Sequence, residues 1–286
     1  MPSDSTLAPD FTGLRQRIQA FYDASSGLWE SVWGEHMHHG YYPLGDPRPE
    51  RRQAQIDLID RLLEWCEVKN PQQILDLGCG IGGSSLVLAE RFQAQVTGIT
   101  LSPIQAKRAT SRAQEKGLST QTQFYVADAL EMPFPAGSFD FVWSLESGEH
   151  MPDKAKFLAE CHRVLKPGGR LLLVTWCHRS GSLSAQDRQQ LQKIYDVYCL
   201  PYILSLADYQ QLAEQTGFQY LKLADWSKEV APFWDLVMES AWDMKVIWQL
   251  LTKGWPTLRA ALSLRLMANG YASGLIRYGL LTGIKP

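Results

Sequence analysis

The chain has 286 residues, of which 45% are hydrophobic and 20% charged, and its formal net charge is −2. This length and apolar content suffice for one large core, or for a domain with an insert. The nearly balanced charge argues against a nucleic-acid-binding protein that relies on phosphate contacts.

Cysteine usage and the N-terminal residues indicate a cytoplasmic protein. Five cysteines occur without any C-x-x-C spacing, which favours reduced thiols over a disulfide framework or a zinc knuckle. The first ten residues are acidic and contain proline, so we expect no signal or transit peptide. No run approaches the roughly 20 apolar residues of a membrane-spanning helix.

The first fifty residues predict a helix over 13–33, after a disordered lead, and then a polar, aromatic loop over 36–42. Further helices are expected before residue 73, over 102–117 and over 154–165. Short apolar runs predict strands between them, at 73–77, 95–100, 123–127, 139–145 and 170–176. Alternation of strands and helices predicts an α/β fold with a parallel sheet covered on both faces.

The remaining part of the chain has a different character. Residues 184–215 predict helix, 218–224 a strand, 231–269 tryptophan-rich helix and 276–284 a last strand. We expect three parts: an N-terminal helix with a cofactor-covering loop (1–50), a cofactor-binding core (51–177), and remaining strands with a helical lid or substrate insert (178–286).

Residues 74–83 read Ile-Leu-Asp-Leu-Gly-Cys-Gly-Ile-Gly-Gly and indicate a cofactor site. A strand ends in Asp76, and alternating glycines precede a helix. Glycine lets the backbone turn with positive φ and lets a ligand approach closely, and ligands of open parallel sheets bind beyond the carboxyl ends of the strands. Gly78, Gly80 and Gly83 also satisfy G-x-G-x-x-G, so a dinucleotide remains an alternative.

The residues that follow the next two strands favour a cofactor with one nucleoside. A nicotinamide cofactor calls for an acid after the second strand, where this chain has Thr100 and Leu101. Asp128 follows the third strand, and its carboxylate can accept from the exocyclic amine of adenine. Gln105 either caps the helix that begins after Ser102 or binds ribose hydroxyls in place of the missing acid.

Several segments together resemble the class I S-adenosylmethionine-dependent methyltransferases, namely 74–82, 128–129, 139–140 and 165–169. Further segments narrow the resemblance to the γ-tocopherol C-methyltransferases of the cyanobacterial type: 22–30, 33–40, 98–103, 146–154, 174–179, 224–226 and 231–234. This resemblance implies a Rossmann-like, doubly wound, mostly parallel sheet with a final antiparallel strand and a helical substrate-binding insert.

The resemblance also implies S-adenosyl-L-methionine as methyl donor, with S-adenosyl-L-homocysteine as its product. Asp76, Gly78 and Gly80 would line the methionine end of the donor. Its nucleoside end would contact Thr100, Leu101, Gln105, Asp128 and Ala129, and the remaining donor contacts would be His38 and Ser144.

The reaction implied is C-methylation of the aromatic ring of γ- and δ-tocopherol, which gives α- and β-tocopherol. A ring carbon beside a phenol oxygen becomes a good nucleophile once the hydroxyl loses its proton, which costs roughly 4 kcal/mol at pH 7 for a phenol like tyrosine. Glu146, Glu149 and His150 follow the fourth strand and are the candidate bases. The alternative is that His150 caps a helix or packs in the core.

Aromatic and histidine-rich segments complete the expected site. The substrate ring is expected to face Tyr22, Trp29, Tyr41, Trp176 and Tyr198. Histidines cluster at 36–39, but they lack matching cysteine or carboxylate spacing, so we expect no metal.

Tryptophans at 226, 234, 242, 248 and 255 form either a core stripe or a lid for a prenyl tail. Residues 242–286 carry six basic side chains against Asp243 alone, which suits peripheral contact of 226–277 with a photosynthetic membrane. The alternatives are methylation of another lipid quinol or an indole-type amine, a non-catalytic donor-binding protein, and an NAD-dependent oxidoreductase.

Overall fold

The computed structural model describes residues 11–45, 48–240 and 255–286. Its centre is a seven-stranded sheet in the order β3-β2-β1-β4-β5-β7-β6. The strands are β1 (Gln73–Leu77), β2 (Gln95–Thr100), β3 (Thr122–Val126), β4 (Phe139–Leu145), β5 (Leu165–His178), β6 (Gln219–Asp225) and β7 (Ile276–Ile284). The first five are parallel, whereas β7 is antiparallel to both of its neighbours. The predicted fold class, including the final antiparallel strand, is confirmed.

The helices cover both faces and one end of this sheet. They are α1 (Phe11–Trp33), α2 (Arg51–Cys66), α3 (Gly83–Phe92), α4 (Pro103–Glu115), α5 (Lys154–Val164), α6 (Ala185–Tyr198), α7 (Leu206–Thr216), α8 (Ser227–Val230), α9 (Pro232–Ser240) and α11 (Trp255–Ala272), with a 3-10 turn η1 (Gly148–His150). Alternate residues of β1 divide between two cores. Ile74 packs into the core that includes α2, while Leu75 and Leu77 pack into the core that includes α5 and α7. Burial on both faces explains the continuous apolar runs of the central strands.

The single helical segment expected over 184–215 is two helices. The first, α6, ends where Cys199 adopts a left-handed conformation (φ 53°) ahead of Pro201. A capping box of Ser205 and Asp208 then begins α7. Local stop and start signals therefore outweigh the continuous helical pattern. All seven strands share one sheet, and the expected division of the chain after residues 50 and 177 stays a prediction.

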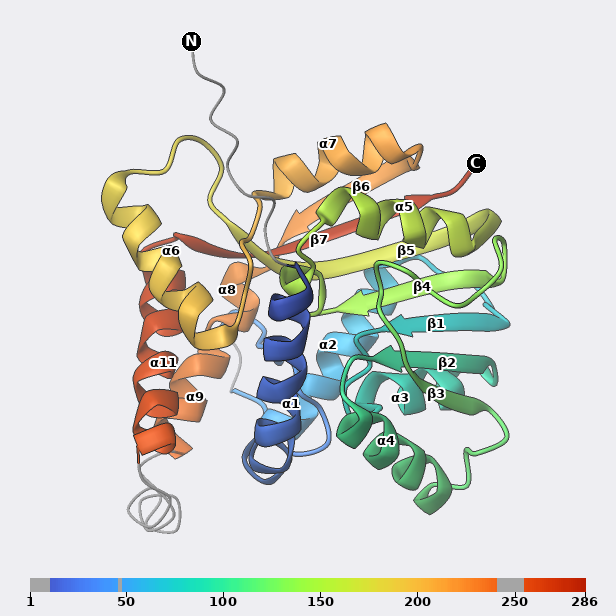
Figure 1. Ribbon diagram of the computed structural model, residues 1–286, viewed down its shortest axis with the longest axis horizontal. Helices are drawn as coiled ribbons and strands as arrows, with labels where there is room; N and C mark the ends of the chain where they lie inside the picture. Colours follow the sequence, from blue (N-terminus) through green and yellow to red (C-terminus); the bar gives the residue numbers. More distant parts are fainter. Residues whose placement is uncertain (1–10, 46–47, 241–254) are drawn as a thin grey trace.

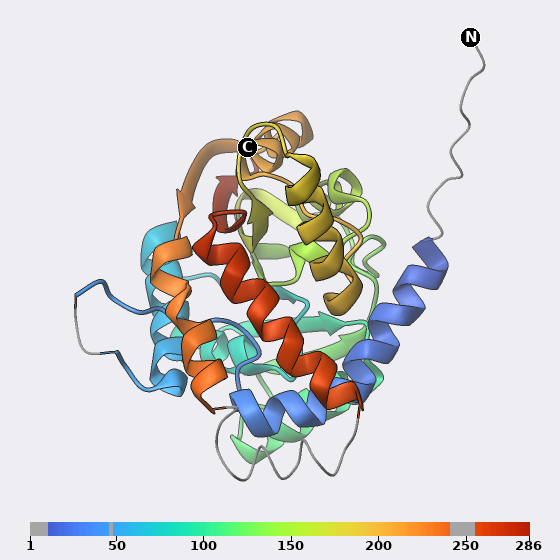
Figure 2. The same cartoon turned by 90° about the vertical axis from the view of Figure 1, so that its left-hand side faces the viewer.

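A ligand-binding site can form at the carboxyl end of the parallel strands, between this edge of the sheet and the helices around it. Helix α1 stands across that end of the sheet, and α6, α9 and α11 form a group beyond it (Figure 1). Turned by 90°, the molecule presents α11 between α9 and α6 (Figure 2), and α11 contacts both helices. Within the described ranges, no helix has the length and apolarity needed to cross a bilayer.

Candidate active site

The glycine turn after β1 forms a cradle at the switch point of the sheet, where β1 lies between β2 and β4. Gly78 has a φ of +75°, and a Cβ added there would lie 2.3 Å from the Cβ of Ser147. The backbone N–H groups of Gly78 and Cys79 both donate to the carbonyl of Ile99. The turn is thus held tightly against β2 and the loop after β4, and only glycine fits at position 78.

Asp76, the next-to-last residue of β1, is a buried carboxyl group with few partners. Its side chain is 2% exposed, and its Oδ2 accepts from the hydroxyl of Ser85 at 2.5 Å. Burial raises the pKa of Asp76 to about 7, although the hydrogen bond from Ser85 lowers it. A cationic group bound beside Asp76 would favour the ionised form and supply the missing counter-charge.

The first cavity, of about 110 Å³, lies over this cradle. Its lining includes Asp76, Gly78, Gly80, Thr100, Leu101, Gln105 and His38, all expected donor contacts, together with Ile18 and Tyr22 of α1. Gln105 accepts from the Thr100 hydroxyl at 2.7 Å through Oε1, while its Nε2 donates to the Ser26 hydroxyl. Ser102 caps α4 by accepting from the backbone N–H of Gln105. The side chain of Gln105 therefore faces the cavity and is not used as a cap.

The second cavity, of about 420 Å³, continues from the first past β2 and β3. Asp128 and Ala129 line it, and it shares Gly78, Thr100 and Leu101 with the first. Asp128 pairs with Arg15 of α1 at 3.1 Å. The expected nucleoside contacts are thus brought together in one continuous hollow.

Ser144 is placed differently from the other expected donor contacts. It is fully buried in β4, and its hydroxyl shares a hydrogen bond with the hydroxyl of Ser147. Ser147 in turn donates to the carbonyl of Leu77. Ser144 therefore supports the loop against which Gly78 packs, and it is not among the residues lining the three cavities described here.

The third cavity, of about 50 Å³, adjoins the first and is largely aromatic. The lining combines the expected substrate contacts Tyr22, Trp176 and Tyr198 with Phe21, Phe233 and Trp234, and it includes all three candidate bases. The two cavities share Tyr22, Met37, His38, Glu146 and His150. A reacting group in one cavity can therefore meet a reacting group in the other.

One expected substrate contact, Tyr41, does not line this cavity. Tyr41 packs its ring 5.4 Å from that of Trp226 and lies beneath Arg61. The backbone N–H of Tyr41 donates to the carbonyl of Ala54 in α2, and Gly40 is packed against the same residue, so Tyr41 is placed toward α2. The side chain of Trp29 lies outside the described residues.

Glu146, which lines the aromatic cavity, is hydrogen-bonded by His39 and Tyr278. Its backbone is left-handed (φ 51°), an uncommon conformation for a residue with a Cβ. One carboxylate oxygen accepts from the His39 backbone N–H at 2.8 Å and from the Tyr278 hydroxyl at 2.7 Å. The other lies 2.8 Å from Nδ1 of His39. Burial opposes ionisation, but the charge and hydrogen bonds of His39 outweigh it and hold the pKa of Glu146 below its usual range.

Glu149 and His150 lie on η1, and their pKa values are shifted in opposite directions. Burial, followed by repulsion from Glu146, raises the pKa of Glu149 to about 8, and its Oε2 accepts from the Thr175 hydroxyl. Burial and the nearby charge of Lys154 lower the pKa of His150 to about 3. His150 Nε2 lies 2.7 Å from the Tyr22 hydroxyl.

Sequence spacing does not identify His39 as a partner of a candidate base. The two residues are 107 positions apart, and a loop histidine carries no periodic signal. The neighbouring His38 lines the first and third cavities, and its Nδ1 lies 2.8 Å from the carbonyl of His39. Within the part of the chain that the structure describes, no group of three or more His, Cys, Asp or Glu side chains has the arrangement of a metal site.

Helix α1 is fastened to the elements around the first two cavities. Its polar contacts join Arg15 to Asp128, Tyr22 to His150, Asp23 to Ser102, Ser26 to Gln105 and Glu30 to Arg108. Every one of these partners lies at or after the carboxyl end of a strand, or on α4. The helix thus covers the hollow that the strand ends form.

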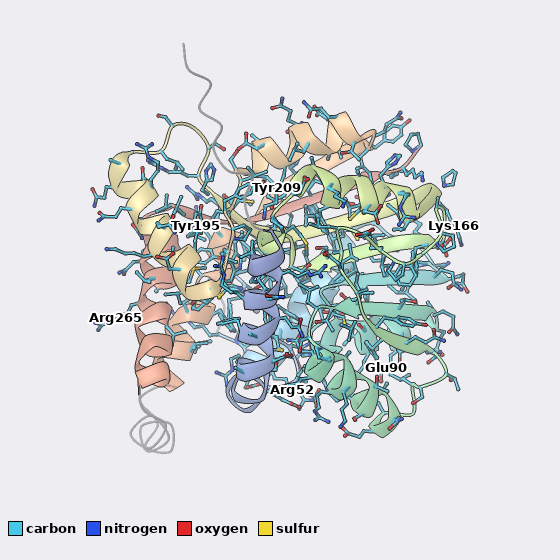
Figure 3. The ribbon with its side chains drawn as sticks, in the orientation of Figure 1. Arg52, Glu90, Lys166, Tyr195, Tyr209 and Arg265 are labelled. Carbon is cyan, nitrogen blue, oxygen red and sulfur yellow. The ribbon has the colours of Figure 1, made fainter. Side chains whose placement is uncertain are left out.

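The described tryptophans of the later part of the chain pack against other aromatic rings. Trp234 is 1% exposed and packs against His39 and Trp176, and Trp226 packs against Tyr41 and Trp65. The side chains of Trp242, Trp248 and Trp255 lie outside the described residues. Arg265, by contrast, is exposed on the outer side of α11 (Figure 3).

Comparison with known proteins bears on this arrangement. A family model described as "Methyltransferase domain" matches residues 75–173. A rice protein named "Probable tocopherol O-methyltransferase, chloroplastic" (Oryza sativa subsp. japonica) is 48% identical over 286 residues, which cover 96% of this chain and 79% of the relative. The "Tocopherol O-methyltransferase, chloroplastic" of Arabidopsis thaliana is 45% identical over 300 residues, covering 99% and 85%. A geranyl diphosphate methyltransferase solved in complex with SAM is similar with a TM-score of 0.71 and 26% identity, covering 88% of this chain and 99% of that one.

Proposed function

Because this chain belongs to the class I S-adenosylmethionine-dependent methyltransferases of the tocopherol type, we propose that it methylates a ring carbon of γ- and δ-tocopherol. The observation that carries the proposal is the contact between two cavities. A donor cavity that ends at Asp76 shares five residues with an aromatic cavity that contains buried acid–base groups.

The donor cavities fit S-adenosylmethionine at both ends. The buried Asp76 suits the cationic methionine end, and the cradle at Gly78 has no room for a side chain. Asp128 can accept from the exocyclic amine of adenine, and Thr100 and Gln105 present polar groups to the ribose between them. When bound, the sulfonium supplies an electrophilic methyl group, so no metal is required.

The acceptor cavity suits a phenolic ring whose hydroxyl must be deprotonated. Phe21, Trp176 and Phe233 offer apolar ring surfaces, whereas Glu146, Glu149 and His150 are among the polar groups of the same wall. The protein must hold the ring carbon in line with the methyl group and exclude water. At about 50 Å³ the cavity is smaller than a chromanol ring, so side chains or α1 must move when the acceptor enters.

Product analysis with several acceptors tests this function. Purified protein with S-adenosylmethionine is expected to methylate γ-tocopherol and δ-tocopherol, and to leave a plastoquinol-type quinol and an indole amine unmodified. Mass spectrometry would give the added methyl group, and NMR its position. A product with a new ring methyl and a free hydroxyl supports the proposal, whereas a methyl ether or a methylated amine contradicts it.

We also propose that the protein reaches its lipid-dissolved substrate by peripheral membrane contact through residues 226–277. The support is the excess of basic residues across 242–286, including the exposed Arg265. Flotation with phosphatidylglycerol vesicles is expected to carry the protein upward, and Arg265→Glu should weaken that binding at least about fivefold. Lys107→Glu, an exposed change on α4, is the matched control. Equal binding of both variants, or protein that stays in the soluble fraction, would remove this part of the proposal.

A further inference from the structure

We propose that His39 is the group that takes the proton of the acceptor hydroxyl, with Glu146 as its positioning residue and Trp176 and Trp234 as donors to the resulting phenolate oxygen. This inference rests on the proposed function and deepens it. It assigns the proton transfer to a loop histidine, whereas the sequence predicts the base among the residues that follow β4.

The first support is the way in which Glu146 fixes His39. Two donors of the histidine, its backbone N–H and its Nδ1, lie 2.8 Å from the two oxygens of the same carboxylate. The Tyr278 hydroxyl completes the set at 2.7 Å. An ionised carboxylate only accepts hydrogen bonds, so Nδ1 carries the proton, and in the neutral imidazole Nε2 presents its lone pair. Both the tautomer and the ring direction of His39 are thereby determined.

The second support is that Nε2 of His39 has no partner. This atom is buried, and among the described residues nothing accepts from it or donates to it. Aromatic rings surround the imidazole, with centroids 4.8 Å away at Phe233, 5.1 Å at Trp234 and 5.8 Å at Tyr271. Leaving a polar atom buried and unpaired is costly. A ligand hydroxyl in the third cavity, which His39 lines, would satisfy it.

The third support concerns the oxygen that such a transfer creates. Trp176 and Trp234 line the same cavity, and the buried Nε1 of each lacks a partner within the described residues. An indole N–H can only donate. Two free donors beside a proton acceptor form a site for an oxygen that becomes negatively charged, which is the arrangement that stabilises developing charge in a water-poor pocket.

His150 is less suited to the same role. Its Nε2 lies 2.7 Å from the Tyr22 hydroxyl of α1, and burial keeps its pKa near 3, which makes it a weak proton acceptor. Glu149 accepts from Thr175 and has the charge of Glu146 nearby, which opposes its ionisation. His39, by contrast, lies beside a carboxylate that would stabilise the imidazolium.

The balanced reaction follows from these positions. The hydroxyl proton passes to Nε2 of His39, and the ring carbon beside the oxygen forms a bond to the methyl carbon as the carbon–sulfur bond breaks with its electron pair on sulfur. The ring carbon then loses its own proton to water, and protonated His39 returns its proton to the oxygen. One proton is released in total, and the donor leaves as S-adenosylhomocysteine.

Variants of His39 test the assignment. His39→Asn keeps a donor near the position of Nδ1 but has no basic nitrogen, and it is expected to lower kcat for γ-tocopherol by about 10²- to 10⁴-fold while donor affinity stays nearly unchanged. Glu146→Gln is also expected to lower kcat, and the double variant should be little worse than His39→Asn alone, because both act through one proton transfer. His178→Asn is the matched control, since the His178 side chain bonds the carbonyl of Arg179 and lines none of the three cavities.

A more acidic acceptor separates a chemical role from a structural one. In an analogue of δ-tocopherol with a fluorine beside the hydroxyl, less of the barrier comes from deprotonation, so the ratio of wild-type to His39→Asn kcat should shrink. The assignment would be overturned if this kcat ratio were unchanged, or if the losses of kcat in the double variant were additive. Full activity of His39→Asn together with loss of activity in His150→Gln would also overturn it. If His39→Asn does not fold, Glu146→Gln must show the same dependence on phenol acidity, or the assignment is wrong. Wild-type protein that forms no methylated tocopherol would refute the proposed function itself.

Discussion

Replacing Gly78 by alanine is expected to lower the free energy of unfolding by about 2–5 kcal/mol and to abolish donor binding. The new Cβ would lie 2.3 Å from the Cβ of Ser147, on a backbone with a φ of +75°. Both the collision and the left-handed conformation oppose the substitution. Chemical denaturation with and without S-adenosylmethionine would measure the two effects.

Gly137 provides the matched control for this prediction. It also has a left-handed backbone (φ +69°), but an added Cβ would meet nothing within 4 Å. Gly137→Ala should therefore cost only the conformational part, about 1–2 kcal/mol, and leave donor binding intact. Equal losses of stability in the two variants would contradict the role given to the contact with Ser147.

Replacing Asp76 by asparagine is expected to weaken binding of S-adenosylmethionine by about 10- to 100-fold, the value of a hydrogen bond to a charged group. The substitution keeps the shape of the side chain but removes the charge that faces the cationic end of the donor. Isothermal titration calorimetry would measure it. Asp140→Asn is the control, because Asp140 pairs with Lys166 at the opposite end of the sheet.

The raised pKa of Asp76 also predicts how pH acts on the donor-free protein and on binding. The carboxyl group titrates near pH 7 when folded but near its ordinary, lower value when unfolded, so its contribution to stability is complete below about pH 4 and is lost as pH rises through 7. Donor affinity should change in the opposite direction, strengthening up to about pH 7 because the ionised form binds the cation. Asp76→Asn should remove both dependences, and an unchanged pH profile in the variant would contradict this origin.

Much of the fold could be predicted because its signals are local. The strand from Gln73 to Leu77 and the glycines after it are contiguous, and the cap at Ser102 lies within a few residues of the helix it begins. Residues at the ends of parallel strands meet at one edge by necessity. The joint lining of the donor cavities by Asp76, Thr100 and Asp128 follows from that geometry.

The contacts of the acceptor site could not be predicted in the same detail, because they join residues that lie far apart in the sequence. Tyr278 and His39 reach Glu146 from positions 132 and 107 residues away, and no spacing rule links them. The direction of the Glu146 side chain depends on a left-handed backbone that a non-glycine residue rarely adopts. Tyr41 shows the same limit, because it shares a loop with His39 but packs against Trp226 and does not line the aromatic cavity.

The fastening of α1 has a thermodynamic consequence. Because α1 lines both donor cavities and bonds to the residues around them, the free energy that orders this helix and the free energy of donor binding belong to one linked equilibrium. Linkage is reciprocal, so donor binding must favour the docked helix by the same factor by which the docked helix strengthens donor binding, and slower proteolysis of the segment in the presence of donor would report it.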